Sequence, residues 1–330
     1  MPSIGSKKIV KKKLLLFLAL GFLFIALKLQ FALEQKIHVN NPNQTFIVEK
    51  GDTLYGILSE IEEDYGLYST WWIRFNYLFK DHPIIKAGIY NIPDKSSITE
   101  LIRRLEEGNV QLFKFAVIEG TVAQKNLETL ENLIKKQGLP FGVPKQVKEL
   151  FSAEGLIMPD TYFFNDEQDL VEVLVGSQLY LDDYLEELWQ SKPDNNPLKT
   201  PQEALVLASI IEREAVLQSE QAIIASVFLA RIEINMKLQA DPTSSYGYYG
   251  DFGRKIGRAV LDDKNLYNTY QVKGLPPGPI CYPSKGALDA AIKSSPGDLF
   301  YFVARGDGSH IFSKTYEEHN KAVKKYIYSK

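Results

Sequence analysis

The chain has 330 residues, of which 45% are hydrophobic and 24% are charged, and its formal net charge is −3. This length predicts about two domains, and the composition excludes a disordered or low-complexity chain. The single cysteine excludes a disulfide framework and a structural zinc site within one chain. Residues 1–28 contain six lysines and no acidic residue, so the remainder is more acidic than the total. A nucleic-acid partner, which needs clustered basic residues, is therefore not expected.

A basic segment followed by an apolar run opens the chain. Five lysines precede an uncharged run over 14–27, and apolar character resumes after Lys28. A helix over 14–33 would be about 30 Å long, enough to cross the hydrocarbon core of a membrane. Because lysines favour the cytoplasmic side, we expect residues 1–13 in the cytoplasm and the body outside the inner membrane. A cleaved signal peptide is the alternative, although no small-x-small cleavage site follows the run.

The next segment predicts a linker and a small module. Residues 34–44 are polar and end in an Asn- and Pro-containing stretch, which is typical of a linker. Alternating and helical patterns then predict, in order, a strand, two helices, a returning strand and a further helix, at 46–49, 54–61, 71–79, 88–92 and 97–107. These elements together make a compact α+β module over 45–110.

The pattern restarts at residue 111 and predicts a larger mixed α/β domain over 111–330. The expected strands cover 113–118 and 299–303, and the expected helices cover 126–137, 170–190 and 201–236. Pro242 and Gly247 punctuate the stretch 238–247, which is therefore interpreted as a loop.

The stretch 204–217 is the most unusual helical pattern in the chain. It is apolar nearly all round, as expected of a buried central helix, yet it carries Glu212, Arg213 and Glu214. At about 100° per residue the two glutamates point to opposite sides, so periodicity does not choose between them. Apolar surroundings raise the pKa of a carboxyl group, which suits a general acid near neutral pH. An ion pair with Arg213 is the alternative role.

Other sites of chemistry are largely absent from the sequence. It has no P-loop, no G-x-S-x-G and no dinucleotide fingerprint, and its four histidines lack metal-ligand spacing. We therefore expect no cofactor and no metal, and interpret Cys281 as a small apolar filler. The polar and aromatic stretches 238–247 and 266–270, with the Pro-rich 274–280, suit a sugar-binding groove.

Taken in order, several motifs resemble the YceG-like family of endolytic murein transglycosylases. They are EGLIMPDTYFF (154–164), ASIIEREA (208–215), LQADPTSSYG (238–247), LYNTY (266–270), GLPPGPI (274–280) and YFVARGDGSHIFSKTYEEHN (301–320). In addition, VEKGDTLYGIL (48–58) resembles the opening of LysM domains, which bind N-acetyl-sugar glycans. The expected fold class is thus α+β: an N-terminal transmembrane helix, a LysM-like module, and a mixed α/β catalytic domain with a buried central helix. A module that packs without a ligand of its own is the alternative for 45–110.

The resemblance implies a lytic transglycosylase that cuts the MurNAc-β-1,4-GlcNAc bond of nascent peptidoglycan and leaves 1,6-anhydromuramoyl ends. Such an enzyme limits the length of glycan strands, and the family layout implies peptidoglycan synthases as partners. The family's catalytic glutamate corresponds to Glu214, with Glu212 as a supporting residue. The remaining family positions, expected to line the cleft, are Gln239, Asp241, Thr243, Tyr267, Asn268 and Tyr270, with His310 and Asn320 as weaker candidates.

Two other functions remain open at this point. One is a non-catalytic peptidoglycan-binding scaffold of the wall-synthesis machinery that holds strands with the module over 45–110. The other is a hydrolase that uses water and needs a second carboxylate, for which Asp241 or Asp160 is the candidate.

Overall fold

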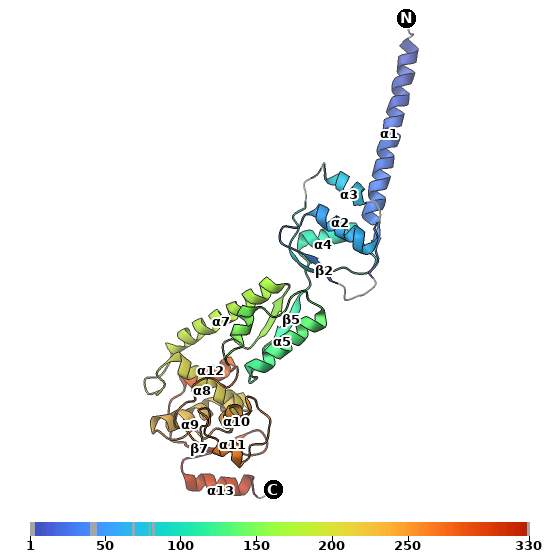
Figure 1. The fold of residues 1–330 in the computed structure, drawn as a ribbon. Coiled ribbons are helices and arrows are strands. Elements are labelled where there is room, and N and C mark those ends of the chain that lie inside the picture. Colours follow the sequence, from blue (N-terminus) through green and yellow to red (C-terminus); the bar gives the residue numbers. More distant parts are fainter. Residues whose placement is uncertain (1–3, 40–44, 68–69, 79, 81–82, 329–330) are drawn as a thin grey trace. The chain divides into compact units, whose positions relative to one another are not determined.

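The structure is a computed structural model, which describes residues 4–39, 45–67, 70–78, 80 and 83–328 (Figure 1). The chain divides into two compact units, Met1–Phe113 and Lys114–Lys330, and both mix helices with short strands. Part of the expected linker, residues 40–44, lies outside the described residues. Lys36–Ile37 of the same linker is instead a short strand, because it pairs with Ser96–Ser97 of the first unit.

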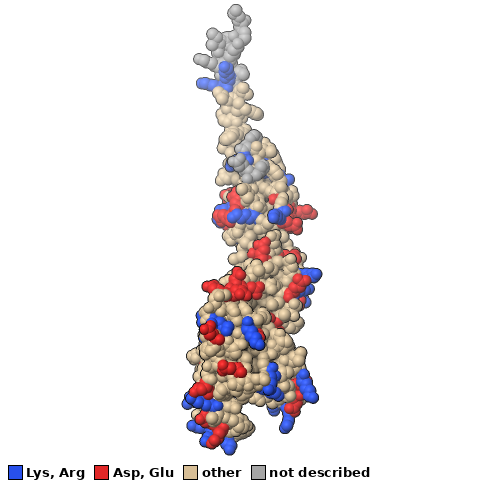
Figure 2. Space-filling model, turned by 90° about the vertical axis from the view of Figure 1, so that its left-hand side faces the viewer, with Lys and Arg blue, Asp and Glu red and all other residues tan. Residues whose placement is uncertain are grey.

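The first helix, α1, runs from Ile4 to Glu34 and contains the apolar N-terminal run. Its segment Lys11–Glu34 is long and apolar enough to cross a membrane, a property that signal sequences share. Every residue from 11 to 28 is exposed, and Figure 2 shows an uncharged segment beyond the basic residues near the N-terminus. Ala32 is fully buried against the core of the first unit, so the end of α1 packs on protein.

The described residues of the first unit continue with three helices and two pairs of strands. In chain order these are β1 (Lys36–Ile37), β2 (Thr45–Val48), α2 (Leu54–Tyr65), α3 (Thr70–Tyr77), β3 (Gly88–Asn91), β4 (Ser96–Ser97) and α4 (Ile98–Glu107). Strands β2 and β3 are antiparallel, with Phe46 opposite Tyr90. Thr53 and Ser97 cap α2 and α4 through their side-chain oxygens, and Gly108 ends α4 in the left-handed conformation.

The second unit is larger and predominantly helical. Its elements are β5 (Phe113–Ala116), α5 (Ala123–Gln137), α6 (Lys145–Leu150), β6 (Thr161–Phe164), α7 (Glu167–Trp189), α8 (Pro201–Glu214), η1 (Gln218–Glu220), α9 (Gln221–Glu233), α10 (Asp241–Tyr249), α11 (Arg258–Asp262), α12 (Lys285–Lys293), β7 (Tyr301–Ala304), β8 (His310–Ser313) and α13 (Tyr316–Tyr326). The described strands pair as β5 with β6 and, antiparallel, β7 with β8.

Helix α8 lies within the hydrophobic core of this unit. The side chain of Thr200 accepts a hydrogen bond from the Glu203 amide, and Pro201 fits the first turn, where its missing N–H has no partner to lose. Residues 204–211 are all buried, and α8 packs against α7, α9, α10 and α12. The last turn of α8, which carries both glutamates, emerges from this core.

The expected single helix over 201–236 is wrong. Helix α8 ends at Glu214 because Ala215 adopts an extended conformation with φ −82° and ψ 101°, and the chain resumes as η1 and then α9. Val216 is consequently 75% exposed rather than continuing a helical face. The apolar pattern runs across the break, so periodicity alone could not locate it.

The interpretation of 238–247 as a loop is also wrong beyond residue 240. Asp241 begins helix α10, and Pro242 occupies its first turn, where proline is well tolerated. Gly247 lies inside this helix, close to the side chain of Asn265. Glycine is required at this position because a Cβ would collide with the Asn265 amide. Both residues that suggested a loop are therefore accommodated within a helix.

Candidate active site

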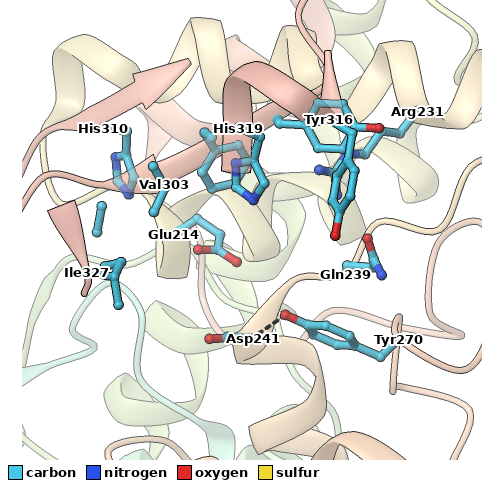
Figure 3. Close-up of a pocket in the computed structure, with 13 residues that line it drawn as sticks. Glu214, Arg231, Gln239, Asp241, Tyr270, Val303, His310, Tyr316, His319 and Ile327 are labelled. Atoms are coloured by element: carbon cyan, nitrogen blue, oxygen red, sulfur yellow. Dashed lines mark hydrogen bonds between the residues drawn. The ribbon is translucent and has the colours of Figure 1, made fainter. Parts of the chain in front are cut away.

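A cavity of about 460 Å³ opens beside the end of α8 (Figure 3). It is bounded by α8, α9, the start of α10, the β7–β8 hairpin and α13. The side chains that line it are mostly polar or aromatic: Glu214, Arg231, Gln239, Asp241, Tyr270, Tyr301, Phe302, Val303, Ala304, His310, Tyr316, His319 and Ile327. Five of the residues predicted from the sequence are among them: Glu214, Gln239, Asp241 and Tyr270, together with the weaker candidate His310.

Glu214 lies in the centre of this cavity as the final residue of α8 (Figure 3). Burial raises the pKa of its carboxyl group to about 8, with a further contribution from the nearby carboxylate of Asp241. The positive charges of Arg231 and Arg213 and the Asp241 backbone N–H act in the opposite direction and are outweighed. The carbonyl end of α8 also disfavours a negative charge there. Glu214 is therefore protonated at neutral pH and able to donate a proton.

Asp241 and Tyr270 form a pair on one side of Glu214. The Tyr270 hydroxyl donates a 2.7 Å hydrogen bond to Asp241 Oδ1, drawn as a dashed line in Figure 3. Burial, followed by the charge of Asp241, raises the pKa of Tyr270, so this hydroxyl remains protonated. Gln239 precedes the pair and has a left-handed backbone with φ 51°, which is uncommon for a residue other than glycine. This conformation accompanies an exposed side chain at the rim of the cavity.

Thr243 and Asn268 are fully buried and do not line the cavity. Thr243 bonds to the Thr269 hydroxyl at 2.8 Å. The Asn268 amide donates to the carbonyls of Val260, Leu261 and Asp263, and its oxygen accepts the Tyr270 N–H at 3.0 Å. Their hydrogen bonds thus join the start of α10 to the 266–270 segment, and so support the two residues that face the cavity, Asp241 and Tyr270.

Tyr267 also lies outside the cavity lining and belongs to a second buried cluster. Its ring contacts Tyr246 with centroids 5.0 Å apart, and the Tyr246 hydroxyl donates to Glu154 at 3.3 Å. Glu154 also accepts the Ala123 N–H at 2.7 Å, at the start of α5, where Val122 provides no side-chain cap. Burial raises the pKa of Glu154 to about 7. No sequence pattern singled out this carboxyl group as part of the site, although Glu154 opens the motif 154–164.

Glu212 points away from the cavity and has a structural partner. Its carboxylate accepts hydrogen bonds from the Ser284 amide at 3.1 Å and the Ser284 hydroxyl at 2.5 Å. The same hydroxyl accepts the Ala287 N–H and so caps α12. Arg213, between the glutamates, donates to the carbonyl of Gly120 and lies 4.1 Å from the centroid of the Phe252 ring. The described contacts of Arg213 are therefore outside the cavity.

Sequence reasoning missed several cavity residues that come from distant parts of the chain. Buried Arg231 on α9 donates through Nε to the Phe300 carbonyl at 2.7 Å. His319 on α13 stacks on Tyr301, with ring centroids 5.4 Å apart, and its buried Nδ1 has no hydrogen-bond partner among the described residues. Burial, reinforced by Arg231, lowers the pKa of His319. No local motif marks these residues, because they meet Glu214 only in the folded chain.

The structure gives different positions to the two weaker candidates, His310 and Asn320. His310 lines the cavity, and its Nδ1 lies 2.7 Å from Glu220 Oε2, which fixes the β8 strand to η1. Asn320 is not among the lining residues. In the view of Figure 3, His319 lies on the side of Glu214 opposite Asp241. In the parts of the chain that the structure describes, no cluster of three or more His, Cys, Asp or Glu residues could hold a metal ion.

A separate groove of about 790 Å³ is lined in part by Ser284, the hydrogen-bond partner of Glu212. Asp160 lines it together with Glu119, Ser284 and Lys285, among others. Burial and the neighbouring Glu212 raise the pKa of Glu119. Asp160 is therefore not a cavity partner of Glu214, whereas Asp241 is.

Comparisons with known proteins find several relatives of this chain. The sequence model of the YceG-like family matches residues 46–325. The endolytic murein transglycosylase of Bacillus subtilis strain 168 is 29% identical over 310 residues, which are 86% of this chain and 84% of that protein. The protein of the same name from Streptococcus pneumoniae R6 is 26% identical, and the match covers 91% of this chain but 62% of the relative. The crystal structure of a YceG-like protein from Listeria monocytogenes is 27% identical with a TM-score of 0.52, covering 84% and 98% of the two chains.

Proposed function

The chain belongs to the YceG-like family, and we propose that it is an endolytic transglycosylase that cleaves peptidoglycan, the activity named for its relatives. The single observation that carries the proposal is the setting of Glu214. One carboxyl group with its pKa raised to about 8 lies in a cavity lined by polar and aromatic side chains. A general acid of this kind is what cleavage of a glycosidic bond requires.

The proposed reaction uses Glu214 twice. Its protonated carboxyl group gives a proton to the bridging oxygen as the bond from MurNAc C1 to that oxygen breaks, which releases the GlcNAc hydroxyl. The C6 hydroxyl of the same MurNAc then attacks C1 and returns its proton to the Glu214 carboxylate. A 1,6-anhydro bond forms, no water is consumed, and the enzyme is restored. Because the nucleophile belongs to the substrate, proximity replaces a second catalytic carboxylate.

Asp241 has an electrostatic role in this proposal. Its negative charge helps to keep the proton on Glu214, and it also favours the positive charge that develops at C1 in an oxocarbenium-like transition state. The hydrogen bond from Tyr270 holds the carboxylate in place. We assign Gln239 and the aromatic rings of Tyr301 and Tyr316 to sugar binding, since amides bond hydroxyls and rings pack on pyranose faces.

The other predicted site residues take supporting roles. Glu212 holds the start of α12, and Thr243 and Asn268 tie α10 to the segment that carries Tyr270. Tyr267 packs in the buried cluster around Tyr246. We therefore propose Glu214 as the catalytic residue and Thr243 and Asn268 as residues that position the cavity wall, whereas Glu212 and Tyr267 serve packing outside the cavity.

The wider role that we propose places the second unit outside the cytoplasmic membrane. The lysines before the apolar part of α1 favour a cytoplasmic N-terminus with the rest of the chain outside. An anchored enzyme that cuts nascent strands would limit their length, and peptidoglycan synthases are the expected partners. A LysM-like role in glycan binding for residues 45–110 belongs to the same proposal.

A hydrolase is the second candidate, because Asp241 lines the same cavity as Glu214 and is a second carboxylate that such a reaction would need. Asp160 lies in the other groove and does not serve this role. The two reactions differ in their products, since a hydrolytic end is heavier by one water than an anhydro end.

Digestion of un-crosslinked glycan strands by the detergent-solubilised full chain tests these possibilities, with products read by mass spectrometry. We expect anhydro ends with the native chain and none with Glu214→Gln. Reducing ends would establish a hydrolase. Strands retained on the protein without cleavage would instead support a peptidoglycan-binding scaffold.

A further inference from the structure

Helix α3 of the first unit carries apolar side chains on two different faces. One face packs inward, where Ile73 and Thr70 are almost fully buried in the unit's core. The other face is turned out: Trp71 is 55% exposed, and Leu78, directly after the helix, is 68% exposed. Phe75 lies between them at helical spacing, with its ring 6.2 Å from that of Trp71. Trp71 and Leu78, with the half-buried Phe75 between them, thus form an apolar patch of the kind that marks a contact surface.

The outward face is continuous with the apolar surface of α1. Helix α3 packs directly against α1 within the same unit. The ring of Trp72 meets the ring of Phe24 edge-on, with centroids 6.5 Å apart, and Trp72 also stacks beside Trp71. Lys28 Nζ lies 5.7 Å from the centroid of the Phe24 ring. Any medium that surrounds Phe24 and Lys28 therefore also reaches the tryptophans of α3.

The packing of α1 limits how much of it lipid can surround. Ala32 is buried in the protein core, about 12 Å along the helix from Phe24, so the hydrocarbon cannot extend to residue 33. The uncharged run over 14–27 is about 21 Å long as a helix. Lysine side chains at both ends can extend to the interfaces and make up the remaining thickness. This places the outer boundary of the hydrocarbon near Phe24 and Lys28, at the level of Trp72.

We propose that α3 lies in the headgroup region of the outer leaflet and that Trp71, Phe75 and Leu78 contact lipid. This inference depends on the membrane anchoring set out under the proposed function and adds a second contact to it. Tryptophan is the residue type best suited to this depth, because its ring is apolar and its N–H is polar. The first unit is then held against the membrane surface by two elements, α1 and α3, which pack against each other.

The chain offers a direct spectroscopic test, because it has three tryptophans: Trp71, Trp72 and Trp189. Trp189 lies in the second unit, at the end of α7. Trp189→Phe therefore leaves both remaining tryptophans on α3, and the double variant Trp71→Phe/Trp72→Phe leaves the one on α7. Both full-length variants are reconstituted into vesicles of phosphatidylethanolamine and phosphatidylglycerol, with bromines on the acyl chains near the headgroup or near the chain end. Circular dichroism checks that each variant is folded.

We expect the emission of Trp189→Phe to lose intensity in brominated vesicles, more with bromines near the headgroup than near the chain end. The double variant is expected to show no such depth-dependent loss. Vesicle flotation and protection of the N-terminus from protease are measured in parallel to test the anchor. Protein that floats but shows no loss of α3 emission overturns this inference and leaves the anchor intact, and it would point to a protein partner for this face. Protein that does not float overturns both the anchor and the inference, while strand cleavage in detergent still tests the catalytic proposal separately.

Discussion

Glu212 and Glu214 lie two residues apart on α8 and differ in every contact that the structure describes. The carboxylate of Glu212 accepts two hydrogen bonds from Ser284 and so holds α12 against α8. The carboxyl of Glu214 projects into the cavity, where burial and Asp241 raise its pKa to about 8. A helical rotation of about 200° separates the two directions. The same residue type thus serves packing on one side of a helix end and chemistry on the other.

The difference arises from where the helix stops. Because Ala215 is extended, the chain turns away directly after Glu214 and leaves room for β7, β8 and α13 to enclose the cavity. Had α8 continued for another turn, Leu217, three residues further on, would have placed an apolar side chain on the same face as Glu214. The break that periodicity could not reveal is therefore the feature that opens the site.

The largest expected effect is the loss of glycan cleavage in Glu214→Gln. The amide can neither donate an acidic proton nor receive one from the C6 hydroxyl, so we expect cleavage to fall by about 10³-fold. The rate at which anhydro ends appear measures this. Glu212→Gln is the matched control on the same helix turn, and it should retain most of the activity because the amide oxygen can still accept from Ser284. Equal losses in the two variants would remove the proposed distinction between them.

Although Glu214→Gln should abolish most of the activity, we expect it to stabilise the folded chain. Between pH 4.5 and 8 the folded chain keeps a proton on Glu214 that the unfolded chain has released, so the free energy of unfolding falls as pH rises. Glu214→Gln has no titrating carboxyl group at this position and therefore removes this contribution to the fall in the free energy of unfolding. We expect the variant to be more stable by about 2 kcal/mol at pH 8, since solvent in the open cavity reduces the full cost of the shift.

Urea unfolding at several pH values measures this difference. The fluorescence of Trp189 reports on the second unit alone when Trp71 and Trp72 are phenylalanine. Burial also raises the pKa of Glu154, to about 7, so both proteins keep a downward slope between pH 4.5 and 7. A constant stability difference across the whole pH range would contradict the raised pKa of Glu214.

The third effect concerns the contribution of Asp241 to the raised pKa of Glu214. Asp241→Asn removes a negative charge that raises the pKa of Glu214, so the alkaline limb of the activity profile should move to lower pH. We expect about a fivefold loss of cleavage near pH 8, because a fall of about one unit in the pKa of Glu214 reduces its protonated fraction there from about one half to about one tenth. Tyr270→Phe keeps the charge and should move the limb less. Complete loss of cleavage at every pH in Asp241→Asn would instead favour the hydrolase.

Much of the first unit could be predicted from its sequence because its signals are local. The helices expected from residues 54 and 97 are present, with Thr53 and Ser97 as their caps, and the strands around Phe46 and Tyr90 pair with each other. These elements depend on neighbours within a few residues, which is the range over which capping and alternation operate.

The candidate site could not be predicted from local sequence signals, because its residues come from distant parts of the chain. Periodicity placed Glu212 and Glu214 on opposite faces but could not say which face would meet the cavity, and only the family resemblance favoured Glu214. Arg231 and His319 reach the site from α9 and α13, and no local pattern connects them to it. Conversely, the family resemblance predicts Thr243 to line the cleft, yet its side chain is fully buried and hydrogen-bonded to Thr269.

The smallest expected effect tests the structural side of the comparison. Ser284→Ala removes both the cap of α12 and the hydroxyl partner of Glu212, so we expect the free energy of unfolding to fall by about 1 kcal/mol. Cleavage should change little when measured well below the unfolding transition, because the Glu212 side of α8 does not line the cavity. Thr315→Ala, which removes the cap of α13, is the matched control. Because α13 carries His319 into the cavity, that variant should lower cleavage at a similar cost in stability. If Ser284→Ala lowered cleavage more than Thr315→Ala did, the two sides of the α8 terminus would not be functionally separate.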